Sequence, residues 1–238
     1  MSKIYLIRHG QASFMAEDYD NLSEKGILQS KALGAYFLKN EIHFDKIFIG
    51  NLKRHQQTFN GFSQAYSEKN IALPEPTYLE ELNEHQVPEA LRIAYDDFIS
   101  KYEDAKMLLD AIVKNPKLKK KNSVKIFGLF LKEYVSGRYV FEHPSIQSWT
   151  DFRVQTEKGK VKILESTKKG ETVGIFTSGG TKSSIIGDIL GMSEEEIGTL
   201  NLAIRNTSFS QLLFSENKLN VFSLNEVSHL TKELITFV

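Results

Sequence analysis

The sequence contains no cysteine. Disulfide bonds, thiolate nucleophiles and cysteine-ligated metal sites are therefore excluded. An excess of charge of one sign is also lacking, because 30 basic residues balance 30 acidic ones. No overall field draws the protein to nucleic acid or to an anionic membrane, so neither is expected as a partner.

Long apolar runs are missing as well. No segment approaches the roughly 20 apolar residues that span a bilayer as a helix. The first apolar run is interrupted by Arg8 and His9, which makes it too short for a signal peptide. We therefore expect a cytoplasmic protein. Repeats, low-complexity segments and interdomain linkers are also absent, which predicts one domain over residues 1–238.

The apolar pattern that is present predicts an α/β protein. Short strand-like runs at 3–7, 46–49, 171–176, 208–213 and 219–222 are separated by helical spacing at 23–37, 51–58, 149–167 and 177–190. This alternation is typical of a three-layer sandwich, in which a mostly parallel central sheet is flanked by helices. Asn51 is the predicted N-cap of the second helix.

Between about residues 86 and 144 the pattern becomes helical and the loops lengthen. Apolar and aromatic residues recur there at helical spacing, and with Trp149 they are expected to form core. We interpret this segment as a helical insertion that packs on the sheet and could act as a lid.

Candidate functional residues gather where the predicted strands end. Arg8, His9 and Gly10 follow the first strand, at the edge where ligands bind in open α/β sheets. Gly10 lets the backbone turn without a Cβ in the way of a ligand. Arg54 opens the helix after the second strand, so it can share a pocket edge with Arg8. A structural histidine beside a surface arginine would explain the tripeptide equally well.

Several short segments, in order along the chain, favour the functional interpretation. They are Arg8-His9-Gly10, Leu22-Ser23-Glu24-Lys25-Gly26, Leu52 to Thr58, Leu82-Asn83-Glu84, Ser178-Gly179-Gly180, Asn206-Thr207-Ser208 and His229-Leu230. In these segments the chain resembles the histidine phosphatase superfamily, which shares its fold with cofactor-dependent phosphoglycerate mutases. The resemblance runs nearly end to end and implies the same fold.

The resemblance also implies a role for each matching residue. His9 would be the nucleophile that accepts a phosphoryl group, and Arg8 and Arg54 would clamp the phosphate oxygens. Glu84 would protonate the leaving oxygen and then activate water. These residue types suit the chemistry, because a neutral imidazole is nucleophilic near pH 7 and guanidinium groups bind phosphate in a planar fork. No metal ion and no cofactor is expected, since the arginines supply the stabilising charge.

Other polar residues near the motifs leave alternatives open. Glu80 and Glu81 lie close to Glu84 in sequence and could supply the acid instead. His55 and His85 adjoin motif residues, but such histidines are more often solvated or helix-capping than catalytic. Asn206 is an orienting residue in one interpretation and a ligand contact in another.

Position 178 departs from the family pattern. The family normally carries a second histidine there, which contacts the phosphate, whereas this chain has Ser178. Loss of one preorganised donor can cost ~10²–10³ in rate. Ser178 and Gly179 begin a helix, however, and free N–H groups at a helix N-terminus favour phosphate. Ser178→His is expected to raise turnover if the space accepts an imidazole. Met15, where mutases often carry asparagine, is a second departure.

Three functions remain from this pattern. The leading one is a metal-independent phosphatase of small phosphorylated substrates, with a phosphohistidine intermediate at His9 and turnover reduced by Ser178. The second is a non-catalytic protein of the same fold that binds a phosphorylated ligand or an interaction partner. The third, an isomerase of the mutase type, is disfavoured by Ser178 and Met15. The expected partner is a small-molecule phosphate ester.

Overall fold

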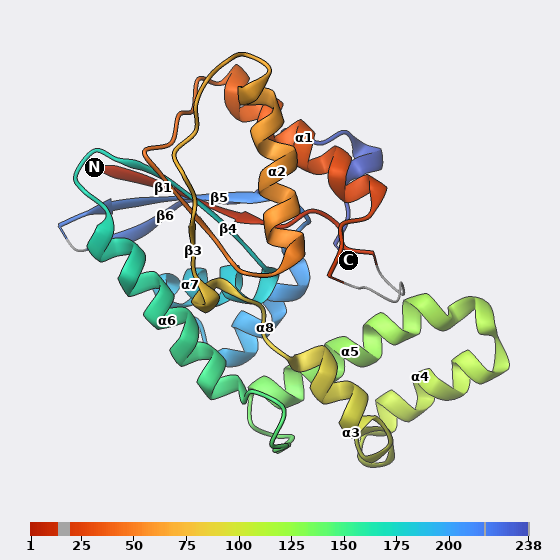
Figure 1. Ribbon diagram of the computed structural model, residues 1–238. Helices are drawn as coiled ribbons and strands as arrows, with labels where there is room; N and C mark the ends of the chain where they lie inside the picture. The colour runs from red at the N-terminus through yellow and green to blue at the C-terminus, as the bar shows by residue number, and fades with distance from the viewer. Residues whose placement is uncertain (14–19, 217, 238) are drawn as a thin grey trace.

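A computed structural model describes residues 1–13, 20–216 and 218–237. A six-stranded sheet with the order β3-β2-β4-β1-β5-β6 forms its centre (Figure 1). The strands are β1 (Ser2–Arg8), β2 (Lys46–Ile49), β3 (Thr77–Tyr78), β4 (Thr172–Thr177), β5 (Phe209–Ser215) and β6 (Lys218–Glu226). The four strands from β3 to β1 are parallel, while β5 runs antiparallel to both β1 and β6. The predicted α/β architecture with a mostly parallel sheet is confirmed.

Helices cover both faces of the sheet (Figure 1). Their bounds are α1 (Glu24–Lys39), α2 (Lys53–Ser67), α3 (Val87–Lys101), α4 (Glu103–Lys114), α5 (Lys119–Val135), α6 (Trp149–Ser166), α7 (Gly179–Leu190) and α8 (Glu194–Ala203), with short 3₁₀ turns at Glu80–Leu82, Pro116–Leu118 and Lys232–Leu234. None of these helices is long and apolar enough to cross a bilayer, among the residues that the structure describes.

The side chains of β1 alternate between the two faces, as the pleat of a strand requires. Tyr5 and Ile7 pack into an aromatic cluster with α1 and α2. Ile4 and Leu6 pack on the other face, in the cluster that α6 and α7 complete. Burial on both faces explains why this strand is a continuous apolar run, as central parallel strands are. It also fixes where β1 ends, and therefore where Arg8 and His9 lie.

The first turns of α1 and α2 are stabilised in different ways. Ser23 caps α1, because its side chain accepts the N–H of Gly26. The prediction of Asn51 as the cap of α2 is wrong: Leu52 holds that position and makes no side-chain bond. Instead, Asp20, in the loop before α1, accepts the N–H of Lys53 at 2.8 Å. A tertiary contact thus satisfies a donor that sequence reasoning assigned to a local residue.

The predicted insertion is helical and forms α3, α4 and α5, which extend away from the sheet (Figure 1). Its core includes Phe98 and Phe130, joined by Trp149 and Phe152 of α6 and Ile197 of α8. No strand residue belongs to this cluster, so the expectation that the insertion packs on the sheet is wrong. Because α6 and α7 already cover that face, the apolar stripes of the insertion pack on α6 and α8 instead.

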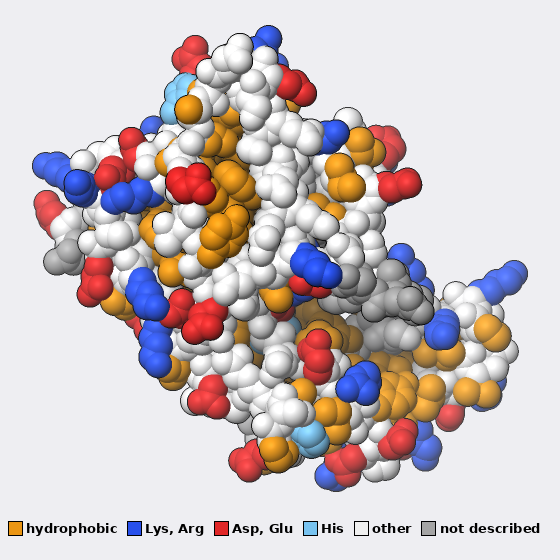
Figure 2. Space-filling model, in the orientation of Figure 1, with side chains coloured by type: hydrophobic (Ala, Val, Ile, Leu, Met, Phe, Trp, Pro, Cys, Tyr) orange, Lys and Arg blue, Asp and Glu red, His pale blue; other side chains and the backbone are white. Residues whose placement is uncertain are grey.

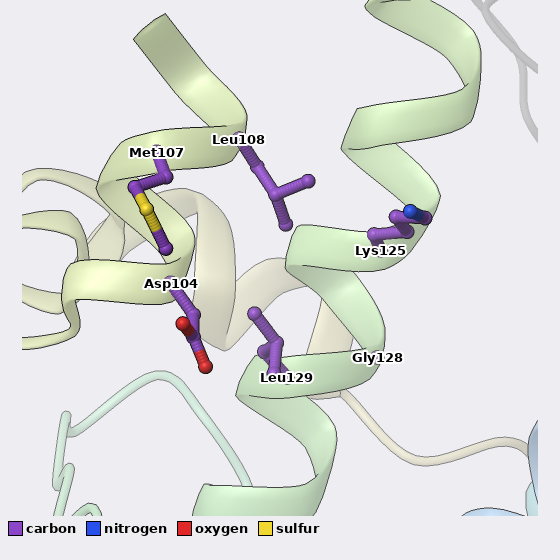
Figure 3. A pocket seen from close by; sticks show the side chains of 6 residues that line it. All are labelled: Asp104, Met107, Leu108, Lys125, Gly128 and Leu129. Atoms are coloured by element: carbon purple, nitrogen blue, oxygen red, sulfur yellow. The ribbon is translucent and has the colours of Figure 1, made fainter. Parts of the chain in front are cut away.

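The insertion exposes part of its apolar surface. Figure 2 shows hydrophobic side chains over this region, and Met107 and Val113 are among the exposed ones. Between α4 and α5 lies an open hollow of about 510 Å³ (Figure 3). Its lining residues are Asp104, Met107, Leu108, Lys125, Gly128 and Leu129. None of the candidate site residues lines this hollow.

Candidate functional site

His9 lies directly beyond β1, and its backbone is held on three sides. Its N–H donates to Thr177 at the end of β4 at 2.8 Å, and its carbonyl accepts the N–H of Thr207 at 3.1 Å. The amide of Asn206 lies 3.5 Å from the same carbonyl, which supports the orienting interpretation of that residue. The parallel strands β1 and β4 thus bring His9 beside the start of α7.

The ring of His9 has one nitrogen bonded to the backbone and one nitrogen left with its lone pair. Nδ1 lies 2.7 Å from the carbonyl oxygen of Gly10. A carbonyl can only accept, so Nδ1 carries the proton and Nε2 keeps its lone pair. Burial lowers the pKa of His9 well below its usual value, and Arg54 and then Arg8 act in the same direction. The imidazole is only 4% exposed. It is therefore neutral at pH 7.

Gly10 is required by a close backbone approach. A Cβ at this position would lie 2.6 Å from the carbonyl oxygen of Gly26 in α1. The Gly10 N–H donates to the Thr58 hydroxyl of α2 at 3.0 Å, and that hydroxyl donates to the Arg54 carbonyl at 2.6 Å. The turn after His9 is thereby joined to both helices on this face of the sheet, which fixes His9 relative to Arg54.

Arg54 is buried in the first turn of α2, where its guanidinium meets a carboxylate. Nη1 donates to Asp20 Oδ1 at 2.7 Å, while Asp20 Oδ2 accepts the N–H of Lys53. A guanidinium and the N–H of a helix N-terminus are the groups that bind a phosphate in other proteins. Asp20 therefore occupies an anion site at the expected position. Sequence reasoning missed Asp20, because nothing marks one aspartate in a polar loop as a partner of a distant arginine.

Arg8 borders the start of α7 on the other side. Its Nη1 donates to the carbonyls of Ile204 and Phe237, the latter at 2.8 Å. A Cβ on Gly179 would lie 3.4 Å from Arg8 Nε, so the absence of a side chain there lets the guanidinium approach the helix. The structure thus places Arg8 beside Gly179 at the start of α7.

Glu84 sits on the N-terminus of α7. Its Oε1 accepts the N–H of Gly180 at 3.0 Å and that of His85 at 3.1 Å. The N–H of Gly180, expected to be free for phosphate, is thus already bound. A Cβ at position 180 would lie 2.2 Å from Oε1, so this glycine is what lets the carboxylate approach. Glu84 therefore lies within the same strand-end cluster as Ser178 and Gly179.

Behind Glu84 lies a second polar layer, which includes a residue that the sequence did not indicate. His85 is buried, with Nε2 3.5 Å from Glu84 Oε1 and 2.9 Å from the side-chain amide of Asn201 in α8. Its Nδ1 accepts the N–H of Val87 at 3.3 Å. Only the packing of α8 reveals Asn201, and α8 itself escaped the sequence analysis although Ser193 and Glu196 form a capping box at its start.

The alternative acids lie elsewhere. Glu81 is buried against α6, where its carboxylate bonds to Lys162, and this bond lowers the pKa of Glu81 below its ordinary value. Glu80 begins the 3₁₀ turn Glu80–Leu82. Of the three, only Glu84 contacts the α7 N-terminus in the part of the chain that the structure describes. The geometry therefore favours Glu84 over Glu80 and Glu81 as the candidate acid.

Ser178 and His55 form a pair at the base of the cluster. Ser178 Oγ lies 2.6 Å from His55 Nε2, and neither residue is exposed. The ring of His55 is 5.7 Å from that of His9, centroid to centroid. The expectation that His55 is solvated is wrong, because α2 turns this side chain inward beneath the strand ends. Burial and then Arg54 lower the pKa of His55 well below its usual value.

Two further basic groups lie behind the strand ends. Lys182 of α7 is fully buried, and its Nζ donates to the carbonyl of Ser208 at 2.7 Å. Burial, and then Arg8, lower the pKa of Lys182 well below its usual value. His229 lies 3.0 Å from the Thr207 hydroxyl, and burial, followed by Lys182, lowers the pKa of His229 to about 3. No periodicity in the sequence marked Lys182 as buried.

Met15 lies outside the described residues. Within those residues, no group of three or more histidine, aspartate or glutamate side chains could hold a metal ion.

The family model of the histidine phosphatase superfamily (branch 1) matches residues 4–125. No curated protein sequence matches the chain.

Solved structures with the same fold are distant in sequence. A phosphoserine phosphatase from Entamoeba histolytica, in complex with 3-phosphoglyceric acid, is 17% identical with a TM-score of 0.63, over 97% of this chain and 100% of the other. An α-ribazole phosphatase from Shigella flexneri is 14% identical with a TM-score of 0.61, over 94% and 98%. A phosphoglycerate mutase from Bacillus anthracis is 18% identical with a TM-score of 0.63, over 96% and 94%. Identities this low show a shared fold.

Proposed function

The chain belongs to the histidine phosphatase superfamily (branch 1), and we propose that it is a metal-independent phosphatase of small phosphate monoesters that acts through a phosphohistidine at His9. One observation carries this proposal. The Nδ1 bond to Gly10 leaves a lone pair on Nε2, and burial with two nearby arginines keeps the ring neutral. A neutral, oriented imidazole between cations is what attack on an anionic phosphate requires.

The remaining residues supply the proton transfers and the positive charge that the reaction needs. His9 Nε2 forms a bond to phosphorus while the bond to the ester oxygen breaks, and protonated Glu84 gives its proton to that leaving oxygen. In the second step Glu84 takes a proton from water, the water oxygen bonds to phosphorus, and the electron pair of the P–N bond returns to Nε2. Arg8 and Arg54 stabilise the charge on the phosphoryl oxygens in both steps.

The substrate class is proposed from the structural neighbours and from the overall charge of the chain. The structural neighbours are named as a phosphoserine phosphatase, an α-ribazole phosphatase and a phosphoglycerate mutase. Each of these names refers to a small molecule. The neutral overall charge offers no field for a polyanion. A small-molecule phosphate ester is therefore the partner that we propose, and the insertion formed by α3 to α5 is the segment that we expect to select it.

A second function is favoured by one contact. Asp20 pairs with Arg54 and with the N–H of Lys53, so a phosphate must compete with a carboxylate for these donors. With Ser178 in place of histidine, this arrangement is also consistent with a protein that binds a phosphorylated ligand without turning it over. An isomerase of the mutase type has no such contact in its favour.

The experiment that separates these functions is hydrolysis of p-nitrophenyl phosphate by the wild type and by His9→Ala, in buffer containing EDTA. We expect hydrolysis by the wild type, loss of it in His9→Ala, and a phosphoramidate on His9 that can be trapped at alkaline pH. Hydrolysis that survives His9→Ala would overturn the covalent mechanism. Binding of phosphate without hydrolysis by the wild type would establish the non-catalytic alternative.

A further inference from the structure

His55 and Ser178 form a pair that the steps above do not use. The pair comes from different parts of the chain, His55 from the first turn of α2 and Ser178 from the N-cap of α7, and its atoms are 2.6 Å apart. Both side chains are fully covered, whereas 9% of the Arg54 side chain and 17% of the Glu84 side chain are exposed. The pair therefore lies at the floor of the site, next to His9.

The surroundings are shaped around the imidazole of His55. A Cβ on Gly50 would lie 2.2 Å from His55 Nδ1 and 2.7 Å from Cε1, so only a glycine at the end of β2 leaves room for the ring. Ser178 has the extended backbone of an N-cap, yet its side chain makes no capping bond to α7. Serine at that position ordinarily accepts an N–H of the helix. Here its hydroxyl is directed to His55 instead.

The imidazole of His55 is held at both of its nitrogens. Burial and then Arg54 lower the pKa of His55, whereas a hydrogen bond to the Gly50 backbone raises it. Nδ1 lies against that backbone, and Nε2 meets the Ser178 hydroxyl at 2.6 Å. A polar side chain that is buried needs such a partner, so the pair fixes the position of the Ser178 hydroxyl beside His9.

We propose that His55 is a positioning residue of the phosphoryl-transfer centre, which supplies from α2 the second imidazole that position 178 lacks. Its Nε2 holds the Ser178 hydroxyl, so that this hydroxyl is fixed beside the phosphoryl group carried by His9. This inference rests on the proposed phosphohistidine at His9. The pair adds no charge, and Arg8 and Arg54 supply the positive charge at the phosphoryl group.

The pair also changes what is expected of Ser178→His. An imidazole at position 178 would meet the ring of His55, whose Nε2 is already in contact with the residue there. The single substitution should therefore not raise turnover, contrary to the expectation from sequence. The double variant His55→Ala with Ser178→His removes the imidazole at position 55 and places one at position 178. The double variant should then be more active than either single variant.

The test is a double-variant cycle on kcat and KM for p-nitrophenyl phosphate. We expect His55→Leu and His55→Ala to lower kcat by about 10² with KM changed less than about threefold, since Ser178 is no longer held in a preorganised position. His229→Leu is the matched control, because His229 is a half-buried histidine whose ring also lies beside a hydroxyl, that of Thr207. It should unfold at a lower temperature, as His55→Leu does, but keep its kcat.

Vanadate binding keeps the inference testable if turnover is slow. Calorimetry should show that His55→Leu weakens vanadate, which resembles the transferring group, by about tenfold more than it weakens inorganic phosphate. A folded His55→Leu variant with unchanged kcat and unchanged vanadate affinity would overturn the inference. Equal losses of kcat in His55→Leu and His229→Leu would also overturn it and leave a purely structural role. The proposed function fails separately, if the wild type itself does not hydrolyse the ester.

Discussion

Lowering the pH from 7.5 to 5.5 should destabilise this protein through His9 and His55. Both have a pKa well below the ordinary value in the folded state, caused first by burial, so neither binds a proton in this range. In the unfolded chain each titrates near 6.5. The unfolded state then binds more protons as the pH falls, and the free energy of unfolding decreases with it.

The magnitude follows from the unfolded-state pKa alone. Between pH 7.5 and 5.5 a group that titrates near 6.5 only in the unfolded state contributes about 1.4 kcal/mol, so the two histidines contribute about 2.7 kcal/mol. His229, with its pKa lowered to about 3, adds a similar amount. Carboxylates whose pKa is lowered, such as Glu81 and Glu171, lose their contribution only as the pH falls below about 4.5. They lie outside this window.

Urea unfolding at pH 7.5, 6.5 and 5.5 measures the effect. His55→Leu should reduce the loss of stability across the window by about 1.4 kcal/mol, because one titrating group has been removed. His143→Gln, at an exposed position, is the matched control and should keep the loss seen in the wild type. If His55→Leu showed the full wild-type loss, His55 would not be held neutral in the folded protein, and the assigned cause of the pH dependence would be wrong.

Three further outcomes are expected. Arg54→Lys keeps the charge but loses the planar fork, so the affinity for inorganic phosphate should fall about tenfold by calorimetry; unchanged affinity would contradict its role as a clamp. Glu84→Gln should reduce kcat for an alkyl phosphate by about 10²–10⁴ and for an aryl phosphate far less, because the aryl leaving oxygen needs less protonation. Glu81→Gln is its control and should affect both esters little, whereas equal losses in Glu84→Gln would count against the acid role. Gly180→Ala places a Cβ 2.2 Å from Glu84 Oε1, so it should mimic Glu84→Gln in this leaving-group comparison, by about tenfold or more on the alkyl ester, and an unaffected alkyl rate would show that the acid acts from another position.

Much of the architecture could be predicted because it depends on local patterns. β1 and β4 are continuous apolar runs, and this pattern follows from burial on both faces of a parallel sheet. A strand that ends in Arg8-His9-Gly10 places those side chains at the sheet edge whatever the rest of the chain does. The α1 cap at Ser23 is equally local, since donor and acceptor lie three residues apart.

The predictions that the structure contradicts were wrong for a different reason, because they concern contacts between distant parts of the chain. Asn51 was the best local cap for α2, but Asp20, 33 residues before Lys53, satisfies the helix instead. The stripes of the insertion predicted helices correctly, yet an amphipathic stripe does not say which surface will cover it. The answer, α6 and α8 rather than the sheet, depended on which faces other helices had already occupied.

At the site itself the sequence determined which chemical groups are present, and in which order: a histidine and arginine at one strand end, an arginine at a helix start, and Glu84 before the insertion. Only the tertiary structure decided that His55 points inward to Ser178, that Asp20 meets Arg54, and that Glu84 accepts the N–H of Gly180. The physical reason is that each contact joins a side chain to a group that lies 34 to 123 residues away in the sequence. Such contacts leave no periodic signal in the sequence, because their distances are set by the packing of α2 and α7 against the ends of β1 and β4.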